Sequence, residues 1–163
     1  MNTGNLGRGA MIAGISGALL FIFMFFTWYQ VPGAEQIEQV GDVLGVDTGS
    51  ASAAVSFSGW ESFDFIDLIC LLAIIVSVGL AAMTLLNASA SLPVAGSAIT
   101  CGIGAFAFLL VLYRVINPPG EGLDREIGLW LGLLATAGIA AGGYLGMQEE
   151  QTSFSDQADR LRG

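Results

Sequence analysis

Long runs of apolar residues, uninterrupted by any charged side chain, dominate this chain. They extend over 9–34, 68–113 and 127–148. A helix that crosses a bilayer needs roughly 20 predominantly apolar residues. The first and third runs therefore each predict one membrane-spanning helix, and the middle run is long enough for two.

A polar segment divides the middle run. Residues 87–91 read Asn-Ala-Ser-Ala-Ser, and Pro93 follows. Proline is tolerated in the first turn of a helix, because its missing N–H has no partner to lose there. The pattern predicts two helices joined by a tight turn, and hence an all-α membrane protein: a single domain over 1–163, built as an antiparallel bundle of four transmembrane helices. The predicted spans lie near 9–29, 65–86, 93–115 and 127–147.

The first run raises the question of a cleaved signal peptide, since Arg8 precedes it. A cleavage site of small residues should then follow directly. Residues 27–32 instead read Thr-Trp-Tyr-Gln-Val-Pro, which is typical of an anchor at the membrane interface. We expect a retained helix.

The polar segments outside the spans differ in character. Residues 30–64 contain the predicted outer loop, which joins the first and second spans and is about 30 residues long. Over 34–44 apolar residues recur every three to four positions with acids between them, which predicts a short amphipathic helix on the membrane surface. Residues 50–60 alternate small apolar residues with serine, as in a strand or a flexible loop. The tail, 148–163, is polar.

Composition narrows the function classes. Apolar residues make up 54% of the chain and charged residues 12%, with no histidine, no lysine and a net charge of −9. These counts remove the commonest general base, the commonest metal ligand and Schiff-base chemistry. The negative charge excludes nucleic acid as a partner. We expect no enzymatic activity, no cofactor and no metal site.

The arginines give the expected orientation. Positively charged residues favour the cytoplasmic side of a membrane protein. Arg8, Arg160 and Arg162 lie outside the first and last spans, whereas the loop 30–64 carries six acids and no base. We expect a protein of the inner membrane, with both termini in the cytoplasm.

Aromatic residues gather near the predicted outer ends of the spans. Tryptophan and tyrosine favour the headgroup level of a bilayer. Together with an acid at the start of the second span they predict an outer-interface cluster. Its members are Trp28, Tyr29, Trp60, Asp64, Tyr113 and Trp130.

Asp67 and Arg114 are the charged residues that fall inside the predicted spans. They lie at matching depth on the second and third predicted spans, which makes them a candidate interhelical ion pair. Two roles are open for the pair, a structural clamp and a proton or ion relay. The inner two-thirds of every predicted span carries no charge, so the clamp is favoured.

Small residues predict how the helices pack. Gly138, Gly142 and Gly146 form a row with a spacing of four on the last span, and such rows allow close approach of helix backbones in lipid. The row serves either packing within the chain or a subunit interface. Cys70 and Cys101 differ in predicted depth by ~10 Å at the helical rise of 1.5 Å per residue, too far for a disulfide, so both are expected to be free.

Several short segments together resemble the small four-helix integral membrane proteins of high-GC actinobacteria. They are Phe-Thr-Trp-Tyr at 26–29, Gly-Trp-Glu-Ser-Phe at 59–63, Tyr-Arg-Val-Ile-Asn-Pro-Pro-Gly at 113–120 and Gly-Leu-Trp-Leu-Gly-Leu at 128–133. The resemblance covers most of the chain outside 30–58 and the tail. It implies a multi-pass protein of the bacterial inner membrane, and it assigns no role to any residue.

The sequence thus favours a structural or accessory subunit whose partners are the lipid bilayer and either copies of itself or another membrane subunit. The alternative is a homo-oligomeric channel, or a protein that binds a lipid or another hydrophobic ligand in a wide outer half of the bundle.

Overall fold

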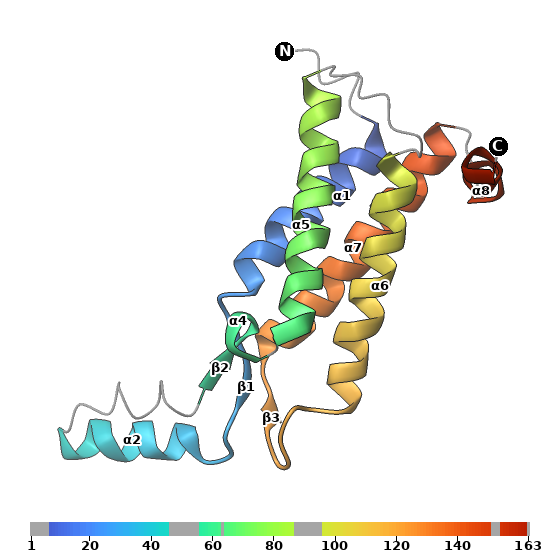
Figure 1. Ribbon diagram of the computed structural model, residues 1–163. Coiled ribbons are helices and arrows are strands. Elements are labelled where there is room, and N and C mark those ends of the chain that lie inside the picture. Colours follow the sequence, from blue (N-terminus) through green and yellow to red (C-terminus); the bar gives the residue numbers. More distant parts are fainter. Residues whose placement is uncertain (1–6, 46–55, 63, 87–95, 151–153, 163) are drawn as a thin grey trace.

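Four helices lie side by side along most of the molecule in the computed structural model (Figure 1), which describes residues 7–45, 56–62, 64–86, 96–150 and 154–162. They are α1 (Arg8–Phe23), α5 (Asp64–Leu85), α6 (Gly96–Ile116) and α7 (Ile127–Glu149). α7 packs against α1 and α6, and α5 packs against the same two helices from the other side. Neighbours run antiparallel, so α1 begins at the end of the bundle where α7 finishes.

Three of these helices are long and apolar enough to cross a membrane: α5 from Phe65 to Leu85, α6 over Gly96–Ile116 and α7 over Ile127–Glu149. In lipid a helix satisfies its own backbone hydrogen bonds, so uncharged runs of this length form helices there. Their positions confirm the predictions for the last three spans to within a few residues. The predicted turn at 87–91 lies outside the described residues.

The first helix is shorter than predicted, and this expectation was wrong. α1 has 16 residues and ends at Phe23, whereas the apolar run predicted a helix to residue 29. The chain instead makes a turn and enters strand β1 (Thr27–Gln30). The Trp28 indole N–H donates a hydrogen bond of 2.9 Å to the Phe23 carbonyl, so a side chain satisfies a group that a longer helix would have bonded internally.

A small antiparallel sheet closes this end of the bundle, which corrects the all-α prediction. β1 is the central strand between β2 (Ser56–Ser58) and β3 (Asp124–Arg125). Tyr29 pairs with Phe57 on one side and with Arg125 on the other. β2 confirms the strand alternative for residues 56–58, whereas residues 59 and 60 are helical. Residues 50–55 of that segment lie outside the described residues. The short helix α4 (Gly59–Ser62) connects β2 to the start of α5.

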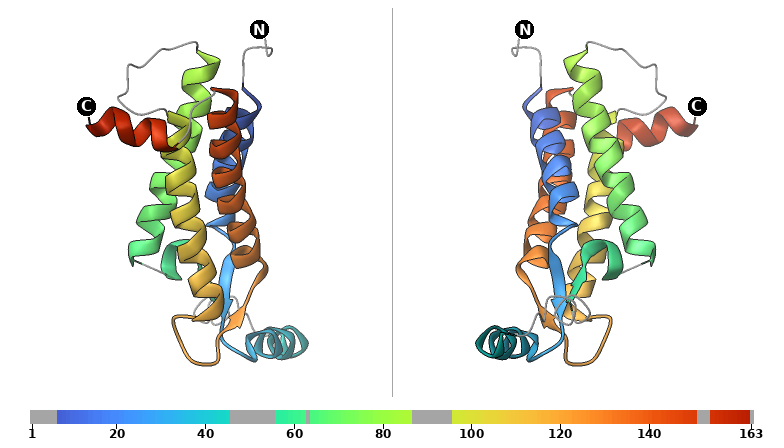
Figure 2. Two further views of the ribbon diagram at one scale, coloured as in Figure 1. Left: turned by 90° about the vertical axis from the view of Figure 1, so that its right-hand side faces the viewer. Right: turned by 90° about the vertical axis from the view of Figure 1, so that its left-hand side faces the viewer.

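Two further helices lie across the direction of the bundle at its opposite ends (Figures 1 and 2). α2 (Ala34–Leu44) follows β1, and its bounds confirm the predicted amphipathic helix. α8 (Phe154–Arg162) lies in the tail.

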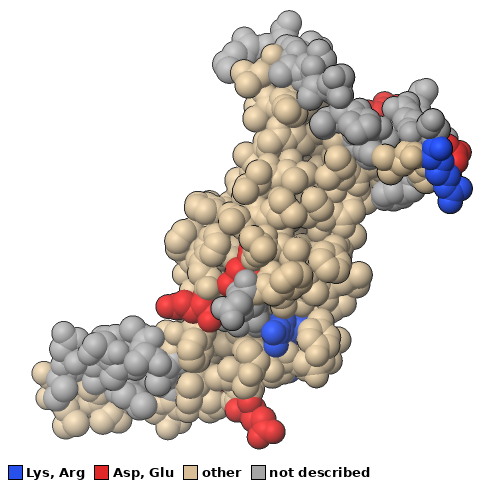
Figure 3. Space-filling view, in the orientation of Figure 1, with Lys and Arg blue, Asp and Glu red and all other residues tan. Residues whose placement is uncertain are grey.

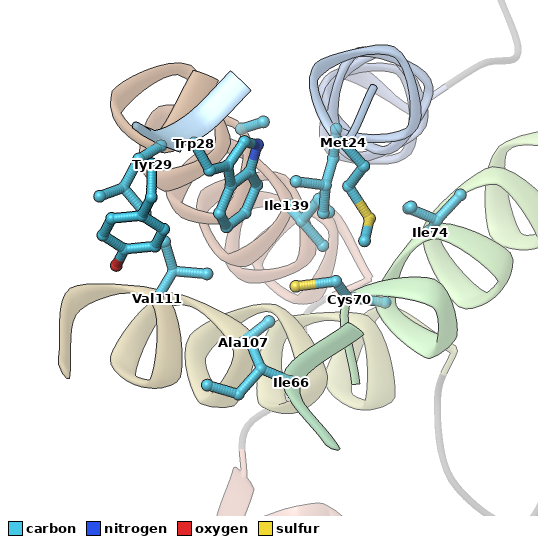
Figure 4. Packing of buried hydrophobic residues seen from close by; sticks show 13 residues of the cluster. Met24, Trp28, Tyr29, Ile66, Cys70, Ile74, Ala107, Val111 and Ile139 are labelled. Atoms are coloured by element: carbon cyan, nitrogen blue, oxygen red, sulfur yellow. The ribbon is translucent and has the colours of Figure 1, made fainter. Parts of the chain in front are cut away.

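The core of the bundle is apolar and so is much of its outer surface. Large side chains such as Leu20, Met24 and Ile139 are fully buried between the helices (Figure 4), whereas Phe65, Leu68 and others on the outer faces are more than half exposed. On the face shown in Figure 3 the charged side chains gather towards the two ends. This distribution is that of a multi-pass helical membrane protein, whose outer surface is covered by lipid.

Candidate functional site

Trp28 fills a slot made by three glycines at the sheet end of the bundle. The side chain is 1% exposed. A Cβ atom added at Gly59, Gly128 or Gly132 would approach atoms of the indole ring to 2.9, 2.7 and 2.6 Å, closer than such carbons pack. The glycines come from α4 and from the first two turns of α7, so one side chain holds three segments together.

Tyr29, also in β1, connects this strand to the end of α6. Its hydroxyl donates a hydrogen bond of 2.7 Å to the Arg114 carbonyl. Burial raises the pKa of the phenol to about 12, against the opposing effect of the nearby Arg114 and Arg125 charges. Arg125, opposite Tyr29 in the sheet, donates from Nε to the Val115 carbonyl at 2.6 Å. The last carbonyls of α6 are therefore bonded by groups of the sheet, as a helix C-terminus requires.

The six residues of the predicted outer-interface cluster do not form one belt. Trp28 and Tyr29 are core residues, not membrane-facing anchors, because the glycine slot and the end of α6 enclose them. Tyr113 and Trp130 are 55% and 47% exposed. Trp60 packs edge-on against Phe21, and its ring centroid lies 5.8 Å from that of Phe25. The side chain of Asp64 is outside the part of the chain that the structure describes.

Asp67 and Arg114 lie at the same end of two neighbouring helices. Asp67 is in the first turns of α5 and Arg114 is in the last turn of α6, and both are partly buried. Cationic residues near a helix C-terminus and acids near an N-terminus interact favourably with the helix dipoles. The ion pair between them stays a prediction.

The glycine row of α7 lies against α1 of the same chain. A Cβ at Gly138 would meet the Ser16 hydroxyl, and one at Gly142 would come within 2.8 Å of the Ala13 Cα atom. At the end of the row, Gly9 lies against the backbone of Gly146. α1 covers this row, so the space for a second subunit there is already filled.

A second glycine contact, which the sequence analysis missed, joins α7 to α6. Gly143 faces the backbone of Cys101, and a Cβ at Gly104 would come within 2.6 Å of the Ala140 nitrogen. Both cysteines are free and buried, as predicted. Gly104 follows Gly96 and Thr100 at a spacing of four. Gly143 has no small residue four positions away on α7, so only the contact between the helices reveals its role.

Two carboxylates at the end of α7 accept hydrogen bonds from the first residues of the neighbouring helices α1 and α6. Glu149 accepts hydrogen bonds from the backbone N–H groups of Arg8 at 2.8 Å and Gly9 at 3.3 Å. Glu150 accepts one of 2.6 Å from the Ser97 hydroxyl in the first turn of α6. Acids are unfavourable at the C-terminus of their own helix but favourable at the N-terminus of an adjacent one. The sequence analysis places both in the polar tail, 148–163, and assigns them no contact.

Apart from Ser97, which bonds Glu150, the fully buried hydroxyl groups of the described helices bond to their own helices. Ser77 donates to the Ile74 carbonyl at 3.1 Å, Thr100 to Gly96 at 2.9 Å and Thr136 to Leu133 at 2.9 Å. All three side chains are fully buried. The proton of a serine or threonine bonded in this way is already engaged by the helix backbone, so these three hydroxyls offer no donor to a ligand.

Two hollows lie at the sheet end of the molecule, outside the bundle. The more polar one, of about 440 Å³, is lined by Gln30, Gln36, Asp124 and Glu126 among others. Within the described part of the chain no three Asp, Glu, Cys or His side chains are placed to hold a metal ion. Comparison of the chain with protein-family models, curated proteins and solved structures finds no match, so no residue role is carried over from a relative.

Proposed function

We propose that this chain is an integral protein of a bacterial inner membrane. Four of its segments cross the bilayer: the three long apolar helices and the segment that begins with α1. Contacts along α7 support the fourth crossing. Gly9 lies beside Gly146 at one end of α7, and the Thr27 carbonyl lies beside Gly128 at the other. The part of α7 between these glycines is about 27 Å long at 1.5 Å per residue, close to the ~30 Å of a hydrocarbon core.

α1, the turn after it and the start of β1 thus extend over one membrane thickness together. Irregular backbone at membrane depth is tolerated where protein buries it and its polar groups are bonded. Met24 and Trp28 of this segment are buried, while Phe25 and Phe26 face outward. The backbone N–H groups of Phe25 and Phe26 donate to the Ile22 and Phe23 carbonyls, and the Trp28 indole also bonds the Phe23 carbonyl. The N- and C-terminal ends of the bundle then lie on one side, which we assign to the cytoplasm from the arginines at Arg8 and in α8.

Within that membrane the chain acts as a structural or accessory subunit and not as an enzyme. The observation that supports this role is the filled interior. Aromatic and aliphatic side chains occupy the sheet end of the bundle and glycine contacts close the other end. The buried hydroxyls of Ser77, Thr100 and Thr136 are bonded to their own helices. This packing leaves the apolar outer faces as the surface available for contact with lipid or with another subunit.

Native mass spectrometry of the protein, extracted from its own membrane in lipid particles without detergent, tests this role. The proposal predicts the mass of the chain plus that of a different protein subunit. A closed homo-oligomer of defined number would contradict it and favour a channel between copies. A lone chain with a tightly held lipid would contradict it in favour of lipid binding.

A further inference from the structure

α2 leaves the bundle sideways and has a glycine in a left-handed conformation at each end. Gly33 before it and Gly45 after it have φ angles of 89° and 67°, in the left-handed region that side chains rarely adopt. The helix extends away from the four long helices at the sheet end (Figures 1 and 2). No other described helix or strand packs along it.

One face of α2 is apolar and uncovered by any described element. Val40, Val43 and Leu44 are 57%, 86% and 68% exposed. They line a shallow groove of about 470 Å³ together with Gln36 and Gln39. Helical geometry places Asp42, which is also exposed, nearly opposite Val40, since two residues advance the helix by about 200°.

The position of α2 indicates what covers this face. A helix that extends sideways from the end of a membrane-spanning bundle lies over the lipids that surround the bundle. The first turn of α2 indicates its depth. Gln36 in this turn lines the polar hollow with Asp124 and Glu126, whereas Ile127 and Trp130 in the first turn of α7 are exposed apolar side chains. The first turn of α2 therefore lies where the polar surface meets the apolar one, which is the headgroup level of a bilayer.

We propose that α2 is an interfacial helix that lies on the outer leaflet, with Val40, Val43 and Leu44 in the boundary between headgroups and acyl chains. The inference rests on the membrane placement proposed above and adds a lipid contact site to it. Apolar burial drives this contact. The segment 34–44 carries three acids and no base, so the charge of anionic headgroups opposes it and the preferred surface is zwitterionic.

Fluorescence quenching of the full-length protein in phosphatidylcholine nanodiscs, at one chain per disc, tests this placement. An environment-sensitive dye is attached to Val40→Cys or, as the matched control, to Asp42→Cys. The unsubstituted chain controls for labelling of the two buried native thiols. We expect blue-shifted emission from Val40→Cys that a nitroxide near the headgroup end of the lipid chain quenches more than one at mid-chain. Asp42→Cys should emit as in water. Replacing part of the phosphatidylcholine by phosphatidylglycerol should reduce the quenching at Val40.

A third position separates failure of this inference from failure of the membrane placement. Leu72, 44% exposed on α5, should be quenched by the mid-chain nitroxide when it carries the dye. If Leu72→Cys behaves so while Val40→Cys emits as in water, α2 does not contact lipid and the inference is wrong. A blue-shifted Val40→Cys that neither nitroxide quenches shows that protein covers the face, which also overturns it. An unquenched Leu72→Cys contradicts the membrane placement itself.

Discussion

Enlarging Gly142 by one methyl group should force α1 and α7 apart. The new Cβ would come within 2.8 Å of the Ala13 Cα atom and of the Gly9 carbonyl oxygen. Both belong to helix backbone, so no side-chain rotation relieves the contact. Overpacking of this kind costs about 1–3 kcal/mol, while the helix propensity of alanine over glycine returns up to ~1 kcal/mol. We expect Gly142→Ala to lower the free energy of unfolding by about 1–2 kcal/mol.

Gly102→Ala is the matched control. Gly102 also lies within a membrane-spanning helix, but a Cβ there would meet no atom within 4 Å. This variant keeps the gain in helix propensity without the clash, so it should be neutral or more stable by up to ~1 kcal/mol. Unfolding in mixed micelles with increasing SDS, followed by tryptophan fluorescence, measures both. Equal stabilities for the two variants would refute the close packing of α1 on α7.

Three further predictions concern polar groups, each measured by unfolding in the same micelles. Burial raises the pKa of Tyr29 to about 12 in the folded chain, against 10.0 in the unfolded chain, so the stability present below pH 10 should fall as the pH rises from 10 to 12. Tyr29→Phe should lose about 1 kcal/mol of stability at neutral pH, because its hydrogen bond is removed, and should show a shallower decline at alkaline pH. An unchanged decline would assign the titrating proton to another group. Glu149→Gln removes the charge that bonds the start of α1 and should cost about 0.5–2 kcal/mol, whereas Glu121→Gln at the exposed turn should cost nothing measurable. Asp67→Asn and Arg114→Gln should each destabilise the bundle, with a double variant that loses less than the sum; additive losses would exclude the ion pair.

The long helices could be predicted from the sequence because lipid imposes a simple rule on them. α5, α6 and α7 coincide with uncharged runs of the required length, and no tertiary contact is needed to explain them. The amphipathic period of α2 is equally local. These elements depend on composition and spacing within one segment, which a single sequence contains in full.

The end of α1 could not be predicted in this way. Hydropathy treats Trp28 alike whether it faces lipid or fills a slot, and the three glycines of that slot lie far from it along the chain. The same limit applies to Glu149, which bonds a backbone N–H that lies 141 residues before it. A polar tail and an aromatic helix end are the natural interpretations of those segments until the two ends of the chain are brought together in space.

The side of the membrane on which each segment lies tests the four-crossing account most directly. An impermeant thiol reagent applied to intact cells or spheroplasts should label Asp42→Cys and Glu121→Cys, both exposed at the sheet end, while the unsubstituted chain stays unlabelled. Epitope tags at the N- and C-terminus should be cut by protease only after the membrane is opened. An N-terminal tag that is cut from the same side as the Asp42 label would show that α1 and β1 do not cross, and would contradict the account.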